Sequence, residues 1–218
     1  MEESTSREKV LKKVRNALIY KTDNPFQYIE SDSEIYKQLE DTADVSFAYA
    51  FTKVGGKFLY CENEIELVQT LKALILENGW QSIYAAEAEI QFTLTQAGVP
   101  FQSDEESFSE MQAAISGCEA LVARTGSILV SSKSESGRRT NAFAPVHIII
   151  AWSDQLVQDL NEALLLVRSK YNSRIPSFIS FITGPSRTAD IEKTLVMGAH
   201  GPRELYVLLV DESLKEDE

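Results

Sequence analysis

The sequence predicts an α/β protein with a mostly parallel sheet, helices on both faces of that sheet and a helical N-terminal extension. From residue 57 onward, short apolar runs alternate with stretches of helical period. The runs are apolar throughout instead of alternating with polar residues, which is typical of strands buried on both faces. Such alternation of strands and helices favours a parallel sheet that is covered by helices.

Seven apolar runs are expected to form the strands. They comprise residues 58–61, 82–85, 120–123, 128–131, 146–151, 178–182 and 205–210. The break between the third and fourth runs is too short for a helical crossover, and it therefore predicts one antiparallel pair within the sheet.

Two of the expected helices have clear start signals. The first covers residues 64–77, with Asn63 as N-cap and Glu66 three residues later. The second covers residues 154–168, with Ser153 as N-cap. The apolar stripes expected to face inward are Ile65, Val68, Leu71 and Ile75 in the first, and Leu156, Leu160, Leu164 and Val167 in the second. Shorter helices are expected at 87–96, 108–115 and 190–197.

The first 55 residues are expected to be a helical extension, followed by one α/β domain over 56–218. An apolar stripe along residues 10–18 predicts an amphipathic helix, and a second helix is expected near 45–52. The stretch 22–44 between them is polar, and the extension as a whole has too little apolar content for a core of its own.

Charge and composition exclude several classes of function. The formal net charge of −12 disfavours nucleic-acid binding. No apolar run approaches the roughly 20 residues of a spanning helix, and no signal peptide is visible, so a cytoplasmic protein is expected. The two cysteines, Cys61 and Cys118, are fewer than the four thiolates of an ordinary iron–sulfur cluster. We therefore expect no metal or cofactor on this chain.

The segment 182–192 is the first candidate site. A strand ends in a glycine-proline turn that contains Gly184 and leads through Ser186, Arg187 and Thr188 to an expected helix start. Free backbone amides and an arginine at such a position suit a carboxylate or a phosphate. The alternative is that Thr188 only caps the helix and that the acidic residues after it complement the helix dipole.

A second candidate is the turn formed by Thr125, Gly126 and Ser127. It serves either as a simple hairpin turn or as part of a ligand crevice beyond a strand end. If its strand neighbours the strand before Gly184, the two turns line one crevice. Arg138 and Arg139 lie in a loop rich in serine, which is either solvated or a lid over an anionic ligand.

The two histidines differ in their context. His200 is flanked by small residues on an expected loop and is the candidate catalytic acid or base. His147 lies between apolar residues of an expected strand, which is typical of a buried core histidine.

Four segments occur in a characteristic order. They read ARTGSILV at 123–130, APVHII at 144–149, ITGPSRTADIE at 182–192 and GAHGPREL at 198–205. In these segments the chain resembles the lactate-utilisation protein C family, whose shared unit is the LUD domain. The resemblance implies a sheet of the sugar-isomerase and coenzyme-A-transferase type. It also implies a role in oxidising L-lactate to pyruvate with partner proteins that carry the iron–sulfur clusters.

Two functions therefore stand as hypotheses. The leading one is a component of an L-lactate-oxidising system that acts with iron–sulfur partners, binds a small anionic ligand and carries no cluster itself. The alternative is a stand-alone enzyme or binding protein for a small carboxylate or a sugar phosphate, which fold type alone does not decide.

Overall fold

The chain forms two compact units in the computed structural model, Met1–Gln38 and Leu39–Glu218. The residues described are 5–19, 38–104, 106–172, 174–191, 194–198 and 200–211. The first unit contains helix α1 (Ser6–Ile19), which was expected from its apolar stripe and whose residues are all exposed. Among the described residues, no helix has the length and apolar character needed to cross a membrane.

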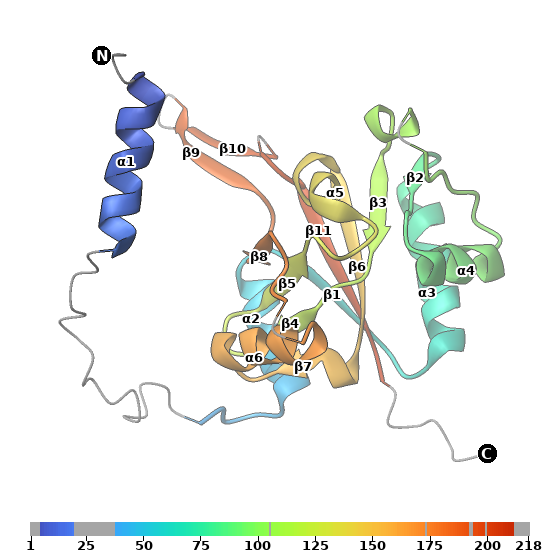
Figure 1. Cartoon of the computed structure of the whole chain (residues 1–218). Coiled ribbons are helices and arrows are strands. Elements are labelled where there is room, and N and C mark those ends of the chain that lie inside the picture. The colour runs from blue at the N-terminus through green and yellow to red at the C-terminus, as the bar shows by residue number, and fades with distance from the viewer. Residues whose placement is uncertain are drawn as a thin grey trace. The chain divides into compact units, whose positions relative to one another are not determined.

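A five-stranded parallel sheet forms the centre of the second unit (Figure 1). Its strands, in spatial order, are β1 (Lys57–Cys61), β11 (Glu204–Val210), β6 (Val146–Trp152), β3 (Ala113–Ser116) and β2 (Ile83–Tyr84). Every neighbouring pair in this sheet is parallel. The mostly parallel α/β architecture predicted from the sequence is therefore confirmed.

A second sheet packs against one face of the first. Its strands, in spatial order, are β7 (Leu156–Val157), β4 (Ala120–Val122), β5 (Ser127–Ser131) and β8 (Ile179–Ile182). Strands β4 and β5 form the antiparallel pair that the short break between them predicted. The expected place of this pair, within the parallel sheet, was wrong, because both strands belong to the second sheet. Strand β5 also pairs with β8, which brings together two segments distant in sequence.

Helices cover both faces of the central sheet (Figure 1). One face buries α3 (Glu64–Asn78) and α4 (Ala88–Ala97), and the other buries α2 (Ala43–Lys53) together with the second sheet. Helix α6 (Leu160–Lys170) covers the outer face of the second sheet, where Ala163 and Val167 are buried. The result is a stack in which α3 and α4 pack on the central sheet, the central sheet packs on the second sheet and α2, and the second sheet packs on α6.

Helix α3 begins as the sequence predicted, but its buried face is rotated. The Asn63 side chain caps the helix by accepting from the Glu66 N–H at 2.9 Å. The buried residues are Leu67, Leu71 and Ile75, whereas Ile65 is 71% exposed. The inward position assigned to Ile65 was wrong, because the stripe through Leu67 meets the sheet instead.

Three predicted helices were wrong in whole or in part. Helix α6 starts at Leu160 with Asp159 as its cap, because the apolar pair Leu156–Val157 is used as strand β7 beside β4. The predicted helix 108–115 is a short 3-10 turn, η1 (Ser107–Ser109), followed by β3, because the small apolar residues of β3 fill the gap between β2 and β6. The predicted helix 190–197 is instead the antiparallel hairpin of β9 (Arg187–Ile191) and β10 (Thr194–Met197).

Helix α2 belongs to the compact α/β unit. Phe47 and Phe51 are fully buried, and their rings stack 5.3 Å apart between the central sheet and β5. The compact unit therefore begins at Leu39, earlier than the boundary after residue 55 drawn from the sequence. Two buried aromatic rings each remove a large apolar area from water, which explains why this helix is held by the core.

The turn between β4 and β5 passes directly over the α2 backbone. Gly126 has a φ of +60°, and a Cβ added there would lie 2.3 Å from the Phe51 backbone nitrogen. Glycine is thus required at this position for two reasons, the left-handed conformation and the close approach.

We predict that Gly126→Ala lowers the free energy of unfolding by about 2–5 kcal/mol. This sum combines ~1–2 kcal/mol for a left-handed non-glycine residue with ~1–3 kcal/mol for overpacking. Gly79→Ala is the matched control, since Gly79 has a φ of +67° with no atom within 4 Å of an added Cβ. Urea unfolding of both variants is the measurement. Equal losses in the free energy of unfolding would show that α2 moves away from the added methyl group at no cost, which would contradict the prediction.

Candidate functional site

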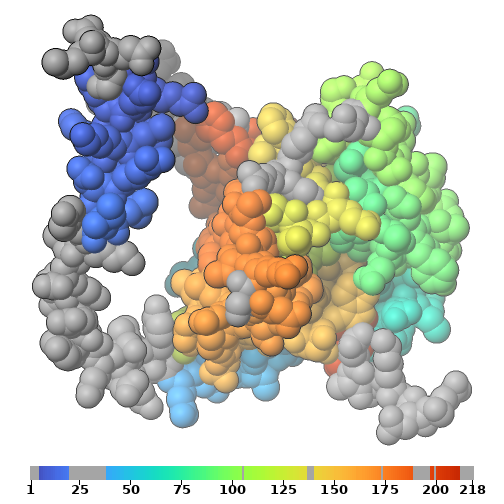
Figure 2. Space-filling view, viewed as in Figure 1, coloured from blue at the N-terminus to red at the C-terminus, as the bar shows by residue number. Residues whose placement is uncertain are grey.

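A polar cleft of about 370 Å³ opens at the carboxyl ends of β3 and β6. Ser116 and Trp152, the last residues of these two strands, both line the cleft. The start of α4, the loop 131–136 and the end of α6 complete its walls. In the space-filling view, the yellow loop lies between the green α4 and the orange α6 (Figure 2). Ligands of α/β proteins collect at this edge of a parallel sheet.

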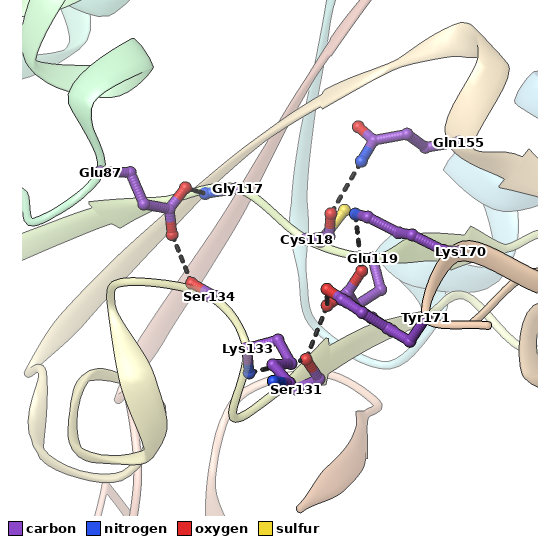
Figure 3. Close-up of polar contacts among 10 residues, drawn as sticks. All are labelled: Glu87, Gly117, Cys118, Glu119, Ser131, Lys133, Ser134, Gln155, Lys170 and Tyr171. Carbon is purple, nitrogen blue, oxygen red and sulfur yellow. Dashed lines mark hydrogen bonds and ion pairs between the residues drawn. The ribbon is translucent and has the colours of Figure 1, made fainter. Parts of the chain in front are cut away.

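Glu119 forms the centre of a hydrogen-bond network on one wall of the cleft (Figure 3). Its carboxylate accepts hydrogen bonds from Ser131 Oγ at 2.6 Å and from Tyr171 Oη at 2.7 Å. Lys170 Nζ donates to the second carboxylate oxygen at 2.8 Å. The Glu119 side chain is only 5% exposed, whereas Lys170 is half exposed. The network thereby joins β4, β5 and α6.

The ionisation of this network follows from its contacts. Burial raises the pKa of Glu119, but the hydrogen bonds from Lys170, Ser131 and Tyr171 outweigh it, so the pKa lies below its ordinary value. Burial lowers the pKa of Lys170, but the hydrogen bond to Glu119 and the attraction to its negative charge together outweigh burial, so the pKa lies above its ordinary value. Both groups are therefore charged near neutral pH.

Glu87, at the start of α4, accepts the hydrogen bonds that join the opposite wall of the cleft. One of its carboxylate oxygens accepts from Ser134 Oγ and Ser136 Oγ, both at 2.6 Å. Its other oxygen accepts from the Gly117 N–H at 2.8 Å. The loop 131–136 is therefore tied to α4 and to the end of β3 through one carboxylate (Figure 3).

A neutral histidine lies behind the cleft. His147 is fully buried in β6, as its apolar neighbours predicted. Burial lowers the pKa of His147 to about 4, so the ring is uncharged at neutral pH. Its Nε2 lies 2.9 Å from Ser116 Oγ, and Ser116 lines the cleft. His147 therefore orients a hydroxyl at the floor of the cleft.

Of the two cysteines, Cys118 is the one that lies at the cleft. It lines the cleft, and its carbonyl accepts from Gln155 Nε2 at 2.7 Å. Burial raises the pKa of the Cys118 thiol, so the thiol is protonated at neutral pH and is a poor nucleophile.

The turn Thr125–Ser127 and the turn that contains Gly184 do lie side by side, but outside the lining of the cleft. Thr125 Oγ1 lies 2.8 Å from Ser127 Oγ, which in turn lies 2.7 Å from Thr183 Oγ1. Their neighbourhood follows from the pairing of β5 with β8. A Cβ added at Gly184 would lie 2.6 Å from the Val54 carbonyl oxygen, so this turn packs on the end of α2.

Arg187 also contacts the end of α2. Its guanidinium donates to the Val54 carbonyl at 2.6 Å. The helix start expected after Thr188 does not exist, because Arg187 and Thr188 begin strand β9. The arrangement proposed from the sequence, an anion held by free helix amides, was therefore wrong.

Ser186, Thr188 and His200 also lie outside the lining of the cleft. The Ser186 N–H donates to the Pro202 carbonyl at 2.8 Å, which joins that segment to the turn carrying the exposed His200. Arg138 and Arg139 lie in the first turn of α5 (Gly137–Phe143). The roles assigned to these residues stay predictions.

The serine-rich loop singled out from the sequence forms one wall of the cleft, but Glu87, Glu119 and Lys170 were not predicted as site residues. Glu119 follows β3, whose residues were assigned to a helix, so its place at a strand end was not recognised. Lys170 and Glu87 stand at helix ends, where charged residues are common. The informative signal was the apolar stretch 113–116 followed by a glycine, a cysteine and a glutamate.

The described residues contain no group of three or more histidine, cysteine or acidic side chains placed to hold a metal ion. The expectation that this chain binds no metal or cofactor stays a prediction.

We predict that Glu119→Gln lowers the free energy of unfolding by about 1–3 kcal/mol at neutral pH, because Lys170 loses a charged partner. A lowered pKa means that Glu119 stabilises the fold above its ordinary pKa and that this gain is lost as pH falls through the folded value. The difference in the free energy of unfolding between wild type and Glu119→Gln should therefore narrow as the pH falls below ~4.3, the ordinary pKa of glutamate. Urea unfolding from neutral pH to below that value is the measurement, and Glu77→Gln, at an exposed position, is the control. A difference between wild type and Glu119→Gln that stays constant with pH would contradict the ionised pair of Glu119 and Lys170.

Comparisons with known proteins place the chain among its relatives. It is 34% identical over 105 residues to an uncharacterized protein of Neisseria meningitidis, covering 48% of this chain and 45% of that protein. It is 34% identical over 99 residues to the lactate utilization protein C of Deinococcus radiodurans, covering 45% of this chain and 46% of that protein. The protein of the same name in Bacillus subtilis is 33% identical over 96 residues, covering 43% of this chain and 40% of that protein. These alignments span less than half the length of each relative.

A solved structure supports the same fold. The crystal structure of a DUF162 family protein from Deinococcus radiodurans superposes with a TM-score of 0.58 at 22% identity, covering 77% of this chain and 96% of that chain. The model of the LUD domain matches residues 46–210, from within α2 to the end of β11. Since this match covers well over half of the sequence, the chain belongs to the LUD domain family.

Proposed function

We propose that this chain is a component of a lactate-utilisation system and that the cleft between α4 and α6 is its ligand site. The observation that carries the role is its similarity to several proteins named lactate utilization protein C, at 31–34% identity. The family match over residues 46–210 includes every element that forms the cleft.

The geometry of the cleft supports binding of a small polar molecule. The volume of about 370 Å³ lies within the ~300–1,000 Å³ of typical ligand pockets. Its walls carry hydroxyls, carboxylates and two lysines, Lys133 and Lys170. The two lysines suit the negative charge of a hydroxylated anion, and the carboxylates suit its hydroxyl group. L-Lactate is the hydroxylated anion suggested by the names of the relatives.

The redox step is proposed to belong to partner proteins. Oxidation of L-lactate to pyruvate removes two electrons and two protons, so an electron acceptor is required. Iron–sulfur proteins of the same system are the proposed acceptors, because two cysteines on this chain are too few for an ordinary cluster. The cytoplasmic location expected from the sequence stays a prediction.

Deletion of the gene should abolish or strongly slow growth of the native host on L-lactate while leaving growth on glucose unchanged. Wild-type protein should restore growth on L-lactate, and so should Glu77→Gln. Glu119→Gln should restore it poorly at equal protein level, because it removes a charge from the wall of the cleft. A deletion strain that grows normally on L-lactate would remove the support for this role.

The isolated chain should contain no stoichiometric iron, whereas its complex with partners from the native host should contain iron. Affinity purification from cells grown on L-lactate, followed by elemental analysis, is the measurement. The chain purified alone after recombinant expression is the control. One or more irons per chain in that control would contradict the assignment of the clusters to partners.

A further inference from the structure

A second hollow adjoins the mouth of the cleft. It has a volume of about 560 Å³ and shares Lys133, Lys170 and Tyr171 with the cleft. Asn172 and Arg174, just beyond α6, complete its lining. We call these three cations, Lys133, Lys170 and Arg174, the basic mouth. They come from two segments distant in the chain that the Glu119 network brings together.

The basic mouth has an excess of positive charge. Lys170 is paired with Glu119 at 2.8 Å, which offsets its charge. Lys133 and Arg174 form no ion pair with any residue that the structure describes. Among the described residues, two of the three cations of the basic mouth thus have no ion-pair partner.

The interior of the cleft has the opposite character. Four acidic residues line it, Glu87, Glu89, Glu119 and Glu135. An anionic group placed among them would be repelled, whereas a hydroxyl could donate to a carboxylate oxygen. A ligand that spans both hollows therefore has its anionic group at the basic mouth and its hydroxyls toward the interior.

We propose that the basic mouth binds the phosphate of a small phosphomonoester whose hydroxyl groups reach the acidic interior. A phosphomonoester carries a charge of about −1.5 to −2 at neutral pH, which matches the two uncompensated cations better than the single charge of a carboxylate does. The guanidinium of Arg174 and the ammonium of Lys133 are the groups that recognise phosphate in proteins. This inference rests on the proposal that the cleft is the ligand site, and it assigns a ligand other than lactate.

Calorimetric titration with glycerol phosphate, glycerol and L-lactate tests this assignment, because all three probes have three carbons and differ in charge. Glycerol phosphate should bind at least about tenfold more tightly than L-lactate, and glycerol should bind more weakly than glycerol phosphate. Lys133→Met and Arg174→Met should each weaken glycerol phosphate binding by about tenfold or more, since each removes one charged contact. Lys72→Met, an exposed lysine on α3, makes the same change in net charge and should leave binding unaltered.

Thermal melts check that each variant remains folded, which is expected because Lys133 and Arg174 are both exposed. L-Lactate binding as tightly as glycerol phosphate would overturn the proposal. So would glycerol phosphate binding that is insensitive to Lys133→Met and Arg174→Met, or equally sensitive to Lys72→Met. None of these outcomes changes the result of the growth test on L-lactate. The lactate-utilisation role and the assignment of a phosphate ligand are therefore tested separately.

Discussion

The structure depends on the burial of strand β6 on both of its faces. Its residues Val146–Ala151 are buried, and its neighbours in the sheet are the parallel strands β3 and β11. A parallel sheet exposed to water on either face would leave these apolar side chains solvated, so both faces must be covered. Helices α3 and α4 cover one face, and α2 with the second sheet covers the other. The cleft opens at the carboxyl ends of β3 and β6, where the second sheet meets the central one.

A buried carboxylate then gives this junction its polar character. Removing Glu119 from water without partners would cost several kcal/mol. Three donors from β5 and the end of α6 offset that cost and also connect the layers. Glu87 has a similar part on the other wall, where it joins the loop 131–136 to α4. The same contacts that stabilise the layers thus place charged and hydroxyl groups around the cleft.

The motifs that resemble the family most clearly contact helix α2 and do not line the cleft. The turns containing Gly126 and Gly184 both pack against α2, and Arg187 donates to the Val54 carbonyl there. Their glycines let two backbones approach closely, which is a requirement of packing. A sequence motif can therefore identify a family through residues that maintain its fold, while other residues line the cleft.

Much of the fold could be predicted from local patterns. Continuous apolar runs identified β1, β5, β6 and β11, and Asn63 with Glu66 identified the start of α3. The short break before Ser127 predicted the antiparallel pair of β4 and β5. These features are determined by neighbouring residues, so they are visible in the sequence alone.

Other features depended on contacts between distant segments. The stretches 113–116 and 156–157 are strands because partner strands lie beside them, and 187–197 contains a hairpin where helical period suggested a helix. Glu119, Lys170 and Ser131 lie far apart in the chain and meet only when β4, β5 and α6 pack together. The sequence by itself determined the fold class and the family of this protein, because both follow from the local order of apolar runs and turns. The tertiary structure alone decided which charged side chains share one cleft, because that depends on the pairing and packing of segments distant in the chain.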